Sequence, residues 1–119
     1  MPESPFHFSF DAVYYHVKDM ERAIGFYRHV LGFPLTSRDY VTRFDVDGVL
    51  FELVPAAADQ PIAGPGNARL SLSVSNIQDA IRYLESRGVK ATPARQEVGG
   101  LLSLFNDPDG NELCLWQNA

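Results

Sequence analysis

Few side chains in this sequence could carry out chemistry, and none of them lies in a familiar catalytic motif. The chain has three histidines and one cysteine, which are His7, His16, His29 and Cys114. A histidine beside a carboxylate can exchange protons near neutral pH, so His16 with Glu52 is a candidate acid–base pair. The alternative for His16 is a purely structural role. The chain contains no phosphate-binding glycine loop, no Gly-x-Ser-x-Gly elbow and no His-Glu-x-x-His metal motif.

The composition is that of an ordinary globular domain and excludes several classes of function. The chain has 119 residues, of which 45% are hydrophobic and 21% are charged. No apolar run approaches the roughly 20 residues of a membrane span, and a single cysteine excludes an internal disulfide. Ten basic against fifteen acidic residues give a net charge of −5, without the basic stripe that nucleic-acid binding requires. We expect a cytoplasmic protein that binds neither nucleic acid nor membranes.

Two pairs of segments repeat each other and define the organisation of the chain. Residues 17–28 match residues 74–85, with valine, alanine and isoleucine at equivalent places. In both copies an Asp or Asn stands where it can cap a helix, and apolar residues follow at helical spacing. The pattern Asp-x-Asp-Gly at 45–48 returns at 107–110 and leads into a strand-like run each time. Two matches in the same order indicate a tandem duplication.

The duplication predicts an α+β fold of two tandem βαβββ modules within a single domain, 1–119. Module 1, about 11–54, is expected to have a strand at 11–17, a helix at 20–31 and strands within 35–54. Module 2, about 68–117, is expected to have a strand at 68–74, a helix at 77–87 and strands within 89–116. The Ala-, Pro- and Gly-rich residues 55–67 link them. Each module should form a curved mixed sheet, with the helix on the convex side and a concave cavity opposite.

Several of these residues resemble the motifs of the vicinal oxygen chelate superfamily. The similar segments are Val17-x-Asp19, Ala23-x-x-Phe26-Tyr27-x-x-x-Leu31-Gly32-Phe33 and Asp107-Pro108-Asp109-Gly110-Asn111. The superfamily includes glyoxalase I, extradiol dioxygenases, fosfomycin-modifying enzymes and bleomycin resistance proteins. The likeness covers residues 11–117 and implies the paired-module fold. It leaves the function open, because one fold supports many chemistries.

The resemblance also implies a metal ion held by four side chains on the first and last strands of the modules. The aligned positions here are Ala12, Glu52, Arg69 and Cys114. Ala12 offers no donor atom, and the permanently cationic Arg69 would repel a divalent ion. Glu52 and Cys114 alone are fewer than the three protein ligands typical of catalytic zinc. We therefore predict no cofactor and no divalent metal at this position.

Strand alternation predicts which side chains face the cavity. They are Tyr14, His16, Glu52, Arg69, Ser71, Glu112, Cys114 and Trp116. Aromatic rings with a few placed polar groups are typical of a small-molecule site. Core packing is the alternative for Tyr14 and Trp116, and a small buried hydrophobe is the alternative for Cys114. We also expect Arg69 and Glu52 to approach within hydrogen-bonding distance, directly or through a water, within one chain or across a dimer interface, so that the guanidinium stands where the superfamily metal would. The alternative is that Arg69 points to solvent at the strand edge.

Three functions are compatible with these residues. We favour a protein that has lost most of the metal ligands and sequesters a small cationic or aromatic organic molecule, like the bleomycin resistance proteins. The second is a metal-dependent lyase, isomerase or dioxygenase with an atypical ligand set, or an enzyme using Glu52 and His16. The third is a degenerate module with only an interaction role. The resemblance also implies a two-fold homodimer, swapped or unswapped, while the identity of the ligand and the roles of His7 and His29 stay open.

Overall fold

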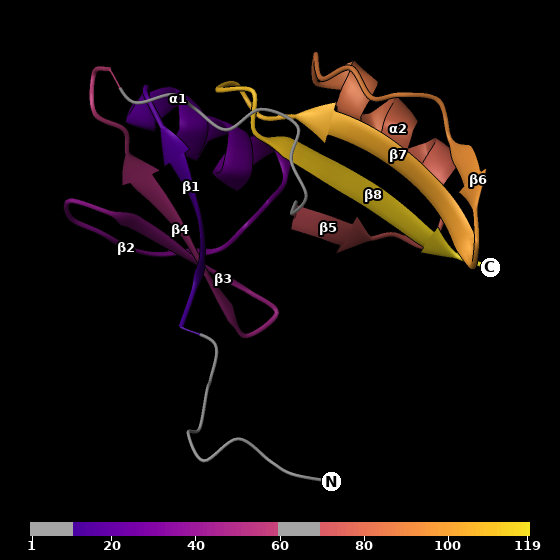
Figure 1. Cartoon of the computed structure of the whole chain (residues 1–119), viewed down its shortest axis with the longest axis horizontal. Coiled ribbons are helices and arrows are strands. Elements are labelled where there is room, and N and C mark those ends of the chain that lie inside the picture. The colour runs from indigo at the N-terminus through magenta and orange to yellow at the C-terminus, as the bar shows by residue number, and fades with distance from the viewer. Residues whose placement is uncertain (1–10, 60–69) are drawn as a thin grey trace, which may run out of the picture.

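The computed structural model describes residues 11–59 and 70–119 and has the predicted α+β fold (Figure 1). The elements of module 1 are β1 (Val13–Val17), α1 (Met20–Gly25), η1 (Phe26–Val30), β2 (Leu35–Arg38), β3 (Thr42–Val46) and β4 (Val49–Pro55). The elements of module 2 are β5 (Leu70–Ser73), α2 (Ile77–Ser86), β6 (Arg95–Glu97), β7 (Gly100–Asn106) and β8 (Glu112–Asn118). Both modules therefore follow the βαβββ order that the repeat predicts.

The two modules form mixed four-stranded sheets with the same topology. The strand orders are β1-β4-β3-β2 and β5-β8-β7-β6. In each sheet the first strand of the module pairs parallel with the last one, and the other pairs are antiparallel. The return from the first strand to the last brings residues far apart in sequence, such as Tyr14 and Glu52, into one ladder.

The first helix begins as predicted but changes its type part-way. Asp19 caps α1 by accepting a hydrogen bond from the backbone N–H of Arg22. After Gly25 the chain continues as the π-helical turn η1, in which Leu31 N donates to Phe26 O over 3.1 Å. The wider turn lets the consecutive residues Phe26 and Tyr27 both enter the core.

Within the described residues, no helix has the length and hydrophobicity needed to cross a membrane.

A single hydrophobic core on the helix side of the sheets extends through both modules. Along β4, Phe51 and Leu53 are buried, while Glu52 between them points to the opposite face. The ring of Phe26 meets that of Phe105 in module 2, with centroids 6.4 Å apart. The core therefore joins the two halves of the chain and leaves the other face of each sheet for a site.

Two buried polar contacts add to this joint between the modules. The Asp107 carboxylate accepts hydrogen bonds from the backbone N–H groups of Asp109 and Asn111, from the Asn111 side chain, and from the Tyr27 hydroxyl over 2.8 Å. Burial, followed by the charge of Asp107, raises the pKa of Tyr27. The hairpin motif that carries part of the superfamily resemblance therefore has a structural role in this chain.

Tyr15 makes the second contact, between β1 and the strands of module 2. Its hydroxyl donates to the backbone carbonyl of Glu112 over 3.0 Å and accepts from the backbone N–H of Leu70 over 2.8 Å. Desolvation in this position raises the pKa of Tyr15, although the hydrogen bond from Leu70 opposes that rise. The hydroxyl therefore links the starts of β5 and β8 to module 1.

Candidate functional site

Module 1 presents a row of aromatic and charged side chains on the sheet face that its helix does not cover. Tyr14 of β1 faces Glu52 of β4 in the parallel ladder, and Glu52 faces Arg43 of β3 in the antiparallel ladder. Their strand neighbours, such as Phe51, are buried in the core. Side chains alternate between the two faces of a strand, so these three residues and His16 share the open face. We call Tyr14, His16, Arg43 and Glu52 the module 1 face.

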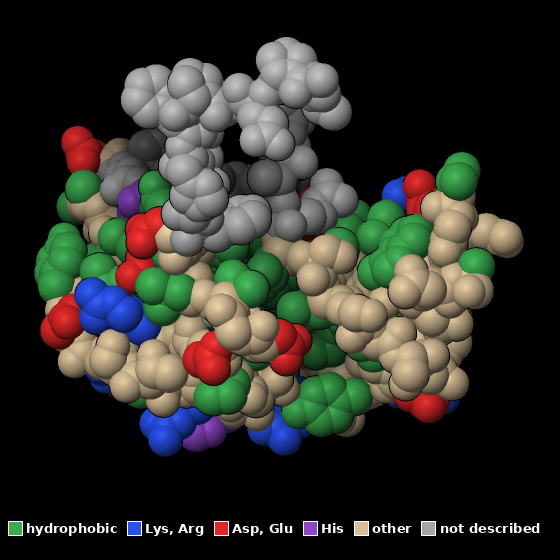
Figure 2. Space-filling view, turned by 90° about the horizontal axis from the view of Figure 1, so that it is seen from below, with side chains coloured by type: hydrophobic (Ala, Val, Ile, Leu, Met, Phe, Trp, Pro, Cys, Tyr) green, Lys and Arg blue, Asp and Glu red, His purple; other side chains and the backbone are tan. Residues whose placement is uncertain are grey.

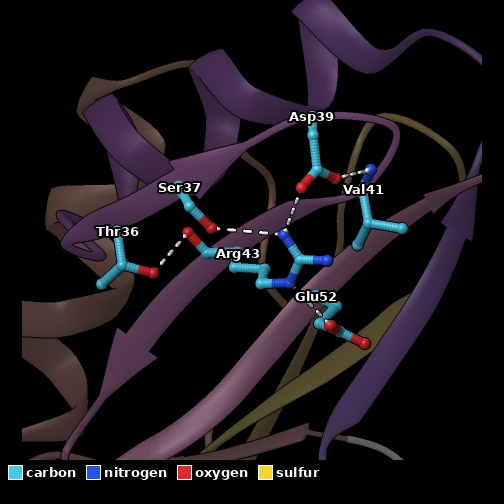
Figure 3. A network of polar contacts seen from close by, with 6 residues as sticks. All are labelled: Thr36, Ser37, Asp39, Val41, Arg43 and Glu52. Atoms are coloured by element: carbon cyan, nitrogen blue, oxygen red, sulfur yellow. Dashed lines mark hydrogen bonds and ion pairs between the residues drawn. The ribbon is translucent and has the colours of Figure 1, made fainter.

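Arg43 holds the Glu52 carboxylate in place (Figure 3). Its Nε donates to Glu52 Oε2 over 3.2 Å, and its Nη1 donates to Asp39 Oδ2 over 3.0 Å and to Ser37 Oγ over 3.3 Å. The hydrogen bond from the Val41 N–H, followed by that from Arg43, lowers the pKa of Asp39. The Asp39 carboxylate in turn raises the pKa of Arg43. Glu52 therefore stands beside a permanent positive charge.

Arg43 was not predicted from the sequence, although the chain contains the signal that places it. Asp47 and Gly48 form a two-residue turn with φ angles of 53° and 82°, the left-handed conformation that a tight hairpin requires. Once a two-residue turn is assigned, the residues before and after it face each other in pairs. Counting outward from the turn then puts Arg43 directly opposite Glu52, as the ladder shows.

The predicted contact between Glu52 and Arg69 is not tested by this structure. Arg69 and His7 both lie outside the described residues. His29 lies exposed on η1, and its backbone carbonyl accepts a hydrogen bond from Arg87 Nη2 over 3.3 Å. Among the described residues, the ion-pair partner of Glu52 is Arg43.

Tyr14 and His16 give the module 1 face an aromatic surface. The rings meet edge to face, with centroids 5.6 Å apart and an interplanar angle of 83°. Tyr14 is 54% exposed, so most of its ring is open to a molecule that approaches the face. His16 is half-buried, and its backbone carbonyl accepts a hydrogen bond from the Asn111 side chain over 3.2 Å. An exposed ring therefore stands beside the Glu52 carboxylate.

A largely apolar hollow of about 540 Å³ continues this face toward the start of β1. It is lined by Asp11, Ala12, Val13, Gly48, Val49 and Leu50. Ala12 and Leu50 precede Tyr14 and Glu52 by two residues, so the alternation places them on the same side of the sheet. The hollow has a size typical of small-molecule sites.

A second hollow lies between the modules. Its volume is about 470 Å³, and its lining includes Leu31 and Phe33 of module 1 and Leu70 and Ser71 of β5. Figure 2 shows this side of the molecule, where hydrophobic side chains gather between the two halves. Ser71, one of the predicted site residues, therefore lies on the module 2 side of a gap that both modules border.

The other predicted site residues of module 2 lie along β8. Cys114 faces Ser71 in the parallel ladder and is a buried free thiol. Glu112 and Trp116 are half-buried, two residues on either side of it. Trp116 packs over Gly100, where an added Cβ would lie 2.7 Å from the indole ring. The group Ser71, Glu112, Cys114 and Trp116 therefore lies on β5 and β8 of module 2. It is separate from the module 1 face, which lies on β1, β3 and β4.

Comparison with known proteins places the fold in a family. The family model described as the glyoxalase/bleomycin resistance protein/dioxygenase superfamily matches residues 9–115. The chain belongs to this superfamily. This finding bears out the resemblance drawn from the sequence motifs. A search of curated proteins finds no match to the chain.

Several solved structures superpose on most of the chain. A glyoxalase family protein from Enterococcus faecalis is 22% identical, with a TM-score of 0.77 and coverage of 92% of this chain and 97% of that one. The fosfomycin resistance protein FosX from Listeria monocytogenes is 14% identical, with a TM-score of 0.79 and 96% of each chain covered. TnmS3, an antibiotic binding protein from Streptomyces sp. CB03234, is 27% identical, with a TM-score of 0.70 and coverage of 95% and 100%.

The described residues do not fit the metal centre that superfamily membership implies. At the aligned positions, Ala12 carries no donor atom and Glu52 is hydrogen-bonded to Arg43. Across residues 11–59 and 70–119, no three His, Cys, Asp or Glu side chains are grouped so that they could hold a metal ion. A divalent ion bound by these residues would therefore lack the three protein ligands typical of a catalytic zinc site.

Proposed function

We propose that this superfamily member binds a small organic molecule on the module 1 face without a metal ion. The observation that carries the proposal is the ion pair between Glu52 and Arg43, at 3.2 Å. Glu52 is the one metal-binding residue type left at the aligned positions of module 1, and its carboxylate is paired with a guanidinium. A divalent ion at Glu52 would have to approach that fixed positive charge, which Coulomb repulsion opposes.

The surroundings of Glu52 support a binding role. An exposed tyrosine ring stands beside the carboxylate, and the lining of the apolar hollow of about 540 Å³ includes Ala12 and Leu50, two residues before Tyr14 and Glu52. A concave apolar surface with a few fixed polar groups is the usual form of a small-molecule site. TnmS3, at 27% identity, is described as an antibiotic binding protein, which adds support from a relative. Bound molecules on such a face would be held by stacking and by hydrogen bonds to Glu52 and Arg43.

A thermal-shift screen of aromatic compounds against the full chain, dialysed against EDTA, tests the proposal. We expect at least one compound to raise the melting temperature equally in EDTA and in added Zn²⁺, Ni²⁺ or Mn²⁺. Mass spectrometry should recover that compound unchanged. Stabilisation that appears only with a metal would contradict metal-free binding, and conversion of the compound would show an enzyme instead.

Paired tyrosine variants locate the binding surface. Tyr14→Ala should remove most of the ligand-induced shift, because it removes the exposed ring of the module 1 face. Tyr40→Ala is the control, since Tyr40 is also a highly exposed tyrosine, at 75%, but lies in the β2–β3 loop. Equal effects of the two variants would place binding elsewhere.

A further inference from the structure

The surroundings of the module 1 face carry more negative than positive charge. Asp39 and Glu52 both pair with Arg43, which leaves this network with one more carboxylate than guanidinium. Asp45 lies two residues after Arg43 on β3, and Asp11 lines the adjoining hollow. The potential at this face therefore favours a positively charged group.

The charge of Arg43 is already compensated, while Glu52 retains a free oxygen. Glu52 Oε2 accepts from Arg43 Nε, which is the one hydrogen bond that the Glu52 carboxylate makes within the described part of the chain. The Glu52 side chain is only 19% exposed, so water screens its charge less than at an open surface. In Figure 3 this second oxygen points away from the guanidinium. The carboxylate is therefore fixed in direction and able to accept one more hydrogen bond.

The Tyr14 ring lies where it can add to the recognition of a cation. Tyr14 and Glu52 face each other on neighbouring strands, which are about 5 Å apart. A cation over the face of a tyrosine ring is attracted by the ring's quadrupole, and a carboxylate beside it strengthens the same preference. The apolar hollow, whose lining includes Ala12 and Leu50 two residues before Tyr14 and Glu52, can accept a flat hydrophobic body.

We infer that the module 1 face selects a flat aromatic molecule that carries an ammonium or amidinium group. The inference rests on the proposed binding function and names the class of ligand for the same site. The positive group hydrogen-bonds to Glu52 Oε1 beside the Tyr14 ring, and the aromatic body lies in the hollow lined by Ala12 and Leu50. Arg43 keeps the carboxylate oriented for this contact.

Three matched probes test the charge preference in EDTA. They are 2-naphthylmethylammonium, 2-naphthalenemethanol and 2-naphthoate, which share one ring system and differ in charge. NMR titration of the full chain should give a dissociation constant for the cation about tenfold below that of the alcohol, with the anion weaker still. Added salt should weaken only the binding of the cation. Equal binding of the alcohol or tighter binding of the anion would overturn the inference.

Matched glutamate variants test the residue assigned to the charge. Glu52→Gln should lower the affinity for the cation to that for the alcohol and leave the affinity for the alcohol unchanged. Glu97→Gln is the control, because Glu97 lies on the edge strand β6 and pairs with Arg95. Tyr14→Leu should lower the affinity for the cation more than the affinity for the alcohol. This variant keeps the test decisive if Glu52→Gln also disturbs Arg43. An unchanged affinity for the cation in both Glu52→Gln and Tyr14→Leu would overturn the assignment.

The same titrations separate this inference from the proposed function. If the neutral probe binds best and Tyr14→Leu weakens its binding, metal-free binding stands and the preference for a cation is wrong. If probes bind only after metal is added, the proposed function itself is wrong. If none of the three probes binds in either condition, the preference for an aromatic cation is also rejected.

Discussion

At the scale of single residues, Tyr27 and Asp107 join the modules through one buried hydrogen bond of 2.8 Å. Tyr27→Phe removes the donor and leaves the ring in place. We expect it to lower the free energy of unfolding by about 1.5–3 kcal/mol, the range for hydrogen bonds to charged groups. Urea unfolding measures the change. Tyr83→Phe is the control, because the Tyr83 hydroxyl donates to the Val30 carbonyl from an exposed position, and its loss should be smaller.

The raised pKa of Tyr27 predicts that the protein loses stability in alkali. In the unfolded chain tyrosine ionises near pH 10, whereas the folded chain keeps Tyr27 protonated to higher pH. The stabilisation is therefore fully present below about pH 10 and declines as the pH rises above it, by up to about 1.4 kcal/mol per pH unit. Urea unfolding between pH 9 and about pH 11 should show this slope. Tyr27→Phe should reduce the slope, and an identical slope in the variant would contradict the assignment.

At the scale of elements, the close approach of β7 and β8 depends on Gly100. An added Cβ would lie 2.2 Å from the Gln117 carbonyl oxygen and 2.7 Å from the Trp116 indole. Gly100→Ala should therefore destabilise the chain by about 1–3 kcal/mol and change the fluorescence of Trp116. Gly25→Ala is the control, because nothing lies within 4 Å of its added Cβ and Gly25 ends α1. Its effect should be neutral or stabilising.

The elements also show which features the sequence could predict. The repeat predicted both modules, and alternation along β4 separated Glu52 from the buried Phe51 and Leu53. The π-helical turn η1 was not predictable, because its bonding depends on packing of Phe26 and Tyr27 rather than on a residue pattern.

The candidate site was only partly predictable for a related reason. Glu52, Tyr14 and His16 follow from the position of two strands, but Arg43 requires the register of a third. That register depends on the two-residue turn at Asp47, which the sequence suggested without fixing. The sequence therefore predicted a contact of Glu52 with Arg69, which lies outside the described residues, and did not predict Arg43 across the hairpin.

At the scale of the whole molecule, each sheet has a helix on one face, and no other helix of the described residues covers the opposite face (Figure 1). An uncovered sheet face needs a partner, a ligand or water against it. We predict a two-fold homodimer with two equivalent cavities, since cyclic dimers are the commonest closed assemblies. Sedimentation at micromolar concentration measures the assembly. A monomer under these conditions would contradict the prediction.

The metal content of the purified chain tests metal-free binding most directly. Protein is purified without chelator, supplied with Zn²⁺, Ni²⁺, Mn²⁺ or Fe²⁺, dialysed, and its bound metal is counted by plasma mass spectrometry. The pairing of Glu52 with Arg43 and the absence of a donor at Ala12 predict retention far below one ion per chain. One tightly held ion per chain that is lost in Glu52→Gln would contradict the account.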